Sequence, residues 1–199
     1  MSRVVVFNNL TLDGVMQAPG RPDEDRRGGF QFGGWATPYA DEVLGKVAGE
    51  RMAKGGPLLL GRRTYEDFAS FWPKQPPDDP FRQALTNTQK YVASTTLEDP
   101  LPWENSTLLT GDVAGAVASL KAKAGKDLVV LGSGDLLQTL MAADLVDEFV
   151  LLIHPLVLGS GRRLFTENSP MAKLQLVDSK TTPKGVMIST FLPAPPETP

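Results

Sequence analysis

The chain of 199 residues contains no cysteine and a single histidine, His154. The absence of cysteine excludes disulfides, thiolate zinc sites, iron–sulfur clusters and a cysteine nucleophile. One histidine cannot form a histidine-cluster metal site, and any Ser-His-Asp triad would depend on that residue alone. Because His154 stands in an apolar run directly before Pro155, we expect it to pack structurally. We therefore expect no bound metal.

Long hydrophobic runs and a strong net charge are also missing. No segment approaches the ~20 apolar residues that span a membrane, and the apolar run at residues 4–7 is too short for a signal peptide. A formal net charge of −3 gives no global attraction to nucleic acids or anionic membranes. We expect a cytoplasmic protein that binds neither, with a small-molecule substrate and a second copy of itself as partners.

The composition, with 41% hydrophobic and 22% charged residues, is that of an ordinary globular protein. The length suits one domain with a full core, which we place at residues 1–192. The proline-rich tail at 193–199 is expected to be disordered.

Short apolar runs alternate with segments of helical periodicity, a pattern typical of an α/β protein. Strands are expected at residues 3–7, 57–61, 90–95, 106–109, 127–131, 149–153, 174–177 and 186–192, the first of them in the centre of the sheet. Helices are expected at 37–54, at 64–68 behind a Thr64–Asp67 capping box, at 113–124 behind Asp112 and from Asp135, with a helical turn at 81–86. The last strands follow one another without helices, so we expect them to pair antiparallel at one side of the sheet.

Periodicity fails between Leu10 and Trp35, where glycines, prolines and charges alternate. A loop of this length inside a compact domain is uncommon unless it serves a function. We interpret it as a lid or substrate-binding loop, with a surface insertion as the alternative.

Two places show a strand that runs through glycine into a helix, and a helix N-terminus favours anions. One is Gly132-Ser133-Gly134 before the helix at Asp135; the third glycine of a dinucleotide fingerprint is absent, so a plain tight turn remains an alternative. The other is Gly61, followed by Arg62 and Arg63, whose guanidinium groups suit phosphate unless they are solvated surface arginines. Together they favour a dinucleotide that carries a 2′-phosphate.

A further glycine pair at residues 159–161 is expected to close a hairpin, with anion binding as the alternative.

The motifs after these strands resemble those of the dihydrofolate-reductase superfamily, and within it the RibD-like reductase domain of the bacterial bifunctional riboflavin-biosynthesis deaminase-reductase. The resemblance spans nearly the whole chain. It is carried by Gly61–Thr64, Leu131–Gly134 through Ala143–Glu148, His154–Gly161, Leu164-Phe165 and Thr11–Gly14. The deaminase half cannot be present, because a zinc deaminase requires cysteine ligands.

The resemblance implies an NADPH-dependent reductase, a homodimer, with a mostly parallel central sheet of about eight strands flanked by helices. It implies cofactor contacts from Gly61, Arg62, Arg63 and Thr64 at the 2′-phosphate, from Ser94 and Thr95 near the adenosine ribose phosphate, and from Gly132, Ser133, Gly134, Asp135 and Leu136 at the pyrophosphate. We expect the Asp135 side chain to turn outward as a helix cap, because a carboxylate would repel pyrophosphate.

In a reductase of this kind the cofactor supplies the hydride and the protein delivers a proton. The candidate acids are Asp13, on a loop that packs near the nicotinamide in the family, and Asp41. The segment from Trp35 to Asp41 resembles the Trp-x-x-Pro-x-Asp of dihydrofolate reductases but is one residue longer. An ordinary turn at Asp13 and a solvated helix acid at Asp41 are the alternatives. Asn8 and Trp35 are predicted substrate contacts.

The most specific function that the resemblance implies is that of a 5-amino-6-(5-phosphoribosylamino)uracil reductase, acting on a small heterocyclic or ribosylamino-pyrimidine substrate. A dihydrofolate or pterin reductase, and a non-catalytic NADP(H)-binding protein, remain alternatives.

Overall fold

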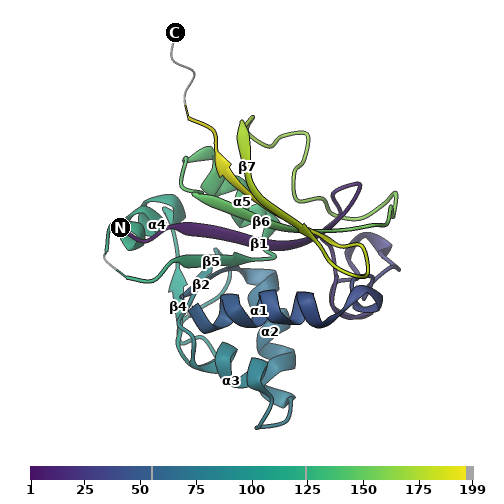
Figure 1. Ribbon diagram of the computed structural model, residues 1–199. Helices are drawn as coiled ribbons and strands as arrows, with labels where there is room; N and C mark the ends of the chain where they lie inside the picture. The colour runs from purple at the N-terminus through teal and green to yellow at the C-terminus, as the bar shows by residue number, and fades with distance from the viewer. Residues whose placement is uncertain (55, 124, 196–199) are drawn as a thin grey trace.

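The computed structural model describes residues 1–54, 56–123 and 125–195, and in this part of the chain eight strands form one sheet (Figure 1). The strand order is β4-β3-β2-β5-β1-β6-β8-β7. The strands are β1 (Val4–Thr11), β2 (Leu58–Gly61), β3 (Lys90–Ala93), β4 (Ser106–Leu109), β5 (Leu128–Leu131), β6 (Glu148–His154), β7 (Leu174–Thr181) and β8 (Met187–Pro193). β1 lies inside the sheet between β5 and β6, so the expected central position of the first strand is confirmed.

The first six strands run parallel to one another, whereas β8 runs antiparallel to both β6 and β7. The predicted fold class, a mostly parallel sheet with antiparallel C-terminal strands, is therefore confirmed. The helices are α1 (Glu42–Lys54), α2 (Arg62–Phe71), α3 (Pro80–Asn87), α4 (Val113–Ala122) and α5 (Gly134–Ala142). Among the described residues no helix is long and apolar enough to cross a membrane.

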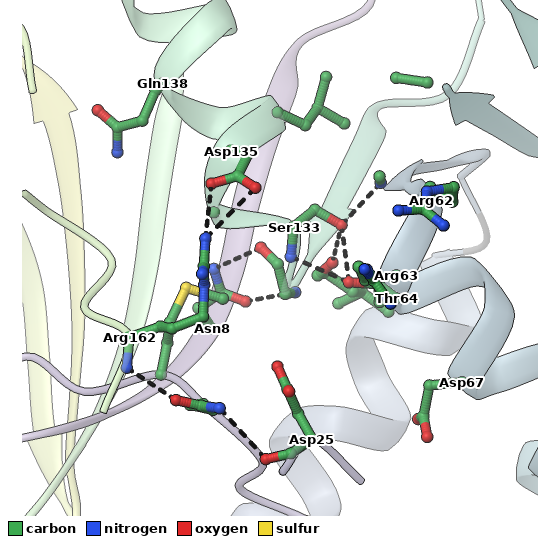
Figure 2. Close-up of a pocket in the computed structure, with 18 of the residues that line it drawn as sticks. Asn8, Asp25, Arg62, Arg63, Thr64, Asp67, Ser133, Asp135, Gln138 and Arg162 are labelled. Atoms are coloured by element: carbon green, nitrogen blue, oxygen red, sulfur yellow. Dashed lines mark hydrogen bonds and ion pairs between the residues drawn. The ribbon is translucent and has the colours of Figure 1, made fainter. Parts of the chain in front are cut away.

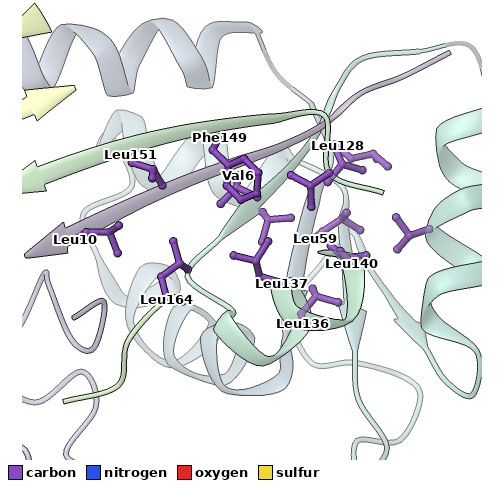
Figure 3. Packing of buried hydrophobic residues seen from close by; sticks show 14 residues of the cluster. Val6, Leu10, Leu59, Leu128, Leu136, Leu137, Leu140, Phe149, Leu151 and Leu164 are labelled. Atoms are coloured by element: carbon purple, nitrogen blue, oxygen red, sulfur yellow. The ribbon is translucent and has the colours of Figure 1, made fainter. Parts of the chain in front are cut away.

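Alternation along the strands divides the core into two layers, because successive side chains of a strand point to opposite faces. On one face Val4 and Val6 of β1 pack with Leu59, Leu128 and Phe149 against α4 and α5 (Figure 3). On the other face the intervening residues pack against α1, α2 and α3. Consecutive residues of β1 therefore face different helices, so neighbouring side chains of this strand lie on opposite faces of the sheet.

Two predicted helix starts differ from the structure. The segment 37–54 is a short 3₁₀ turn at Thr37–Tyr39, followed by α1 from Glu42, since Ala40 is extended. The Thr64–Asp67 capping box is wrong, because α2 already begins at Arg62 with Gly61 as its N-cap. Asp112 does cap α4, with its carboxylate accepting the Gly115 N–H at 2.9 Å.

Other differences lie in the connections. The predicted hairpin at residues 159–161 is wrong: β6 pairs with β8, and the glycines lie in the long connection between β6 and β7. α3 is a full helix capped by Asp79, where only a turn was expected. At the C-terminus β8 runs through Pro193, and residues 196–199 of the predicted disordered tail lie outside the described residues.

Replacement of Leu137 by alanine is expected to lower the free energy of unfolding by about 3 kcal/mol, because this fully buried side chain of α5 would leave a cavity against the sheet. Urea denaturation measures the change. Leu12, which is 56% exposed, gives the matched control, and Leu12→Ala is expected to cost less than about 0.5 kcal/mol. Equal costs for the two variants would contradict the core assignment.

Candidate functional site

A cavity of about 1700 Å³ opens at the carboxyl ends of the parallel strands. It exceeds the roughly 300–1000 Å³ of common small-ligand pockets, so it has room for two ligands side by side. The lining comes from the strand ends at 7–9, 61–64, 93–96 and 131–136, and from the loops at 16–19, 23–27 and 161–167. In open α/β sheets this edge is where ligands bind.

The turn between β5 and α5 forms the first anion site of the cavity. Gly132 and Ser133 both have positive φ, 56° and 58°, and no side chain caps the helix. The first backbone bond of the helix runs from the Leu137 N–H to the Ser133 oxygen, so the N–H groups of Gly134, Asp135 and Leu136, which line the cavity, have no acceptor within the helix. A Cβ at Gly134 would lie 3.0 Å from the Met16 sulfur, so a larger residue here would displace the flexible Met16 side chain.

The turn between β2 and α2 forms the second anion site. Its N-cap, Gly61, offers no side chain, so the first N–H groups of α2 are also free of a side-chain cap. Arg62 and Arg63 both line the cavity, Arg62 in an ion pair with Glu66 at 3.3 Å and Arg63 exposed. A helix N-terminus with two guanidinium groups is suited to a phosphate.

Ser133 and Thr64 join these two turns directly (Figure 2). The Ser133 N–H donates to Thr64 Oγ1 at 3.1 Å, and the two hydroxyls lie 3.1 Å apart. The Ser133 hydroxyl also accepts the Gly61 N–H at 2.9 Å. Both residues were predicted as cofactor contacts; the structure shows that their hydroxyls hold the two anion sites at a fixed separation.

Asn8 supports the same turn. Its side-chain oxygen accepts the Gly132 N–H at 2.6 Å, and its amide nitrogen donates to the Gly132 carbonyl at 3.1 Å. The side chain lines the cavity but is 4% exposed, and the Gly132 backbone uses both of its polar atoms. The structure therefore places Asn8 under the anion site rather than free for the predicted substrate contact.

Trp35, the other predicted substrate contact, does not line the cavity. It is 6% exposed and donates its indole N–H to the Gln17 carbonyl at 2.7 Å. Gln17 itself was not foreseen: its amide group binds the carbonyls of Asp25 and Arg27 and accepts the Arg162 N–H at 3.0 Å. It joins two loops that line the cavity.

Asp135 turns outward as expected, with its side chain 86% exposed, but it is not the helix cap, since Ser133 holds that position. Its carboxylate pairs with Arg162 at 3.2 Å, from the connection after β6 (Figure 2). The predicted contacts Leu136, Ser94 and Thr95 also line the cavity. Ser94 accepts the N–H groups of Thr96 and Leu97, which shapes the turn after β3.

Neither predicted acid lies against the cavity. The Asp13 carboxylate accepts the Thr11 hydroxyl at 2.6 Å and the Leu158 and Gly159 N–H groups, and these bonds lower its pKa. The Asp41 carboxylate accepts the Leu44 N–H at 2.9 Å, which lowers its pKa and fixes the start of α1. Both are held in their ionised form, which is unfavourable for a proton donor. The structure therefore gives Asp13 a role in a turn and Asp41 a role at a helix start, and it places neither carboxylate at the cavity.

Among the several acids that do line the cavity, Glu24 and Asp67 are the two whose pKa is raised, in both cases by burial. Glu24 accepts the Gly20 and Arg21 N–H groups within its own loop. Asp67 pairs with Arg21, whose guanidinium lies 4.0 Å over the Phe71 ring, while its second oxygen, Oδ2, is buried with no partner in the described chain. The Arg21 contact anchors the 12–35 loop on α2.

The described residues contain no group of three or more histidine, cysteine, aspartate or glutamate side chains arranged to hold a metal. The cavity instead offers two uncapped helix ends at fixed separation, arginines at one of them, and a buried acid between loop and helix. A dinucleotide with a 2′-phosphate fits this donor set, because each of its anionic groups meets N–H or guanidinium donors.

Comparison with known proteins identifies the family of this chain. The family model described as the RibD C-terminal domain matches residues 2–188. The uncharacterised Bacillus subtilis protein YyaP is 31% identical over 134 residues, which cover 65% of this chain and 70% of YyaP. YwjB of the same organism is 29% identical over 131 residues, 66% of this chain and 70% of YwjB.

Solved structures share the fold. A riboflavin-biosynthesis-type protein of Shewanella sp. PV-4 superposes with a TM-score of 0.68 at 22% identity, covering 97% of this chain and 99% of its own. A pyrimidine reductase-like protein of Corynebacterium diphtheriae gives 0.67 at 13%, covering 98% and 92%. Dihydrofolate reductase of Enterococcus faecalis, complexed with NADP(H) and RAB-propyl, gives a TM-score of 0.60 at 14% identity, covering 96% of each chain.

Thr64→Val is expected to destabilise the protein by about 1–3 kcal/mol, because the buried Ser133 N–H loses its acceptor. Hydrogen exchange of the Ser133 amide should accelerate with it. Thr96→Val is the control, since this exposed threonine lines the cavity but its hydroxyl has no partner within the described residues. Equal stability of the two variants would contradict the role of Thr64.

Proposed function

The chain belongs to the RibD C-terminal domain family, and on this basis we propose that it is an NADPH-dependent reductase. Its substrate is a small heterocycle, of the 5-amino-6-(5-phosphoribosylamino)uracil type. The observation that carries the proposal is the pair of uncapped helix N-termini that open on one cavity, with two arginines beside the second.

In this proposal each anion site has its own task. The turn at residues 132–136 binds the pyrophosphate, and the α2 turn with Arg62 and Arg63 binds the 2′-phosphate. Bound NADPH would supply the hydride. Asn8 and Thr64 keep the turns in place, and the loop at 16–27 limits the access of water to the substrate side.

The proton comes from Asp67 in this proposal. A general acid must face the substrate and keep its proton near neutral pH, and burial raises the pKa of Asp67 in that direction. The pKa of Glu24 is raised too, but one oxygen of its carboxylate accepts two backbone N–H groups and thereby shapes the loop. An acid of this kind in the cavity favours turnover over simple binding of NADP(H). The pterin alternative depended on Asp41 in the cavity, and Asp41 lies outside it.

Arg62→Ala and Arg63→Ala are each expected to weaken NADPH binding about tenfold or more and to change NADH binding little, because only the 2′-phosphate distinguishes the two cofactors. Quenching of the three tryptophans on titration measures both affinities. Lys74→Ala removes the same charge from an exposed position outside the cavity and should leave the preference unchanged. Equal losses for NADPH and NADH would refute the assignment.

Asp67→Asn is expected to lower turnover of the phosphoribosylamino-uracil substrate by about 10²–10⁴ while NADPH affinity is kept. Wild-type turnover should decrease as pH rises through the pKa of Asp67, and the variant should lose this dependence. Asp23→Asn is the control, because Asp23 also pairs with Arg21, at 3.6 Å, but is exposed. An unchanged pH profile in Asp67→Asn would remove Asp67 as the donor.

A further inference from the structure

His154, the only histidine, is a buried titratable group that the proposed chemistry leaves unused. It ends β6, is 1% exposed, and lies between the edges of two aromatic rings, Trp35 at 5.2 Å and Tyr39 at 5.4 Å between centroids. Burial alone lowers the pKa of His154 to about 4, with no contribution from a charged neighbour. The imidazole is therefore neutral at physiological pH and carries one N–H.

The position of that N–H follows from the two ring nitrogens. Nε2 lies 3.0 Å from the side-chain oxygen of Asn9, whereas Nδ1 is buried with no partner in the described residues. A proton on Nδ1 would leave a buried donor unpaired, which is rarer and more costly than an unpaired acceptor. The proton accordingly lies on Nε2 and is donated to the Asn9 oxygen.

This bond determines which end of the Asn9 amide faces the cavity. Asn9 lines the cavity and is partly exposed, and His154 is the only hydrogen-bond partner of its side chain in the described chain. Asn8 is the contrast, since both polar atoms of its amide are bonded to Gly132 on the other face of the sheet. With the Asn9 oxygen turned to His154, the amide nitrogen is left for a ligand in the cavity.

We propose that His154 is a positioning residue: it orients Asn9 so that the amide N–H groups are fixed hydrogen-bond donors toward the substrate, which selects substrates with a carbonyl oxygen at this place. A ring with an amino group at this position would place its own N–H donors against the N–H donors of Asn9, and a site of this kind binds such a ring much more weakly. The substrate part rests on the proposed reductase function. The orientation of Asn9 does not depend on it.

The first experiment reads the orientation without any ligand. The protein has a single imidazole, so ¹⁵N NMR can assign the tautomer of His154 without ambiguity. The expected result is a proton on Nε2 and no titration between about pH 5.5 and pH 8. Asn9→Leu should shift the Nε2 signal. A proton on Nδ1, or a titration near the ordinary pKa of histidine, would overturn the proposal.

The second experiment tests whether the site selects a carbonyl-bearing ring. It compares two probes: 5,6-diaminouracil, which keeps both ring carbonyls, and 2,4,5,6-tetraaminopyrimidine, which carries amino groups in their place. Both are titrated in the presence of NADP⁺. The wild type should prefer the uracil at least about tenfold. His154→Leu and Asn9→Leu should lose this preference, and His154→Gln, whose amide can donate to Asn9, should recover it. The affinity for NADPH should be the same in all four proteins.

The outcomes separate this inference from the proposed function. A preference that survives in both leucine variants, or no binding of either probe to the wild type, would overturn the selection by Asn9. Failure of NADPH to bind, with the Nε2 tautomer observed, would overturn the reductase proposal while the positioning of Asn9 by His154 stands.

Discussion

The hydrogen bonds between Ser133 and Thr64 are the interaction on which the site depends. Two helices, α2 and α5, begin at strands that are neighbours in the sheet but lie about seventy residues apart in the chain. Their open N–H groups become one binding site only if the turns keep a constant separation. Such bonds contribute about 0.5–1.5 kcal/mol each, so they determine position, while burial of the core supplies most of the stability.

Because side chains alternate along β1, its two adjacent asparagines lie on opposite faces of the sheet and have different roles. Asn8 points to the face of α5 and holds the turn at Gly132, whereas Asn9 points to the face of α1 and meets His154. One strand thus supports the proposed cofactor side and the proposed substrate side of the cavity from opposite faces of the sheet. A shift of one residue in the pairing of β1 would exchange the two side chains and remove both functions.

The sequence predicted the strands well, because apolar runs such as Leu128–Leu131 depend only on local composition. It predicted that the glycine turns line a site, since glycine before a helix N-terminus is a local signal for a turn that can approach an anion. The prediction failed where a contact with a residue distant in the chain determines the role of a side chain. The sequence suggests Thr64 as a helix cap, but α2 begins earlier, at Arg62, and the Thr64 hydroxyl instead bonds Ser133. Asp67 acquires its raised pKa from burial beneath a loop that begins far away in the chain. No local pattern distinguishes Asn8 from Asn9.

The residues that hold the two turns together are different from the residues that distinguish their ligands. Ser133, Thr64 and Asn8 keep the geometry, whereas Arg62 and Arg63 project from α2 and bear no part of that network. If the chain binds NADPH as proposed, cofactor preference can drift during evolution, or be redesigned, by substitutions at two positions without rebuilding the framework. The proposed site is modular, in that affinity for the shared part of a dinucleotide and choice between its two forms would reside in separate side chains.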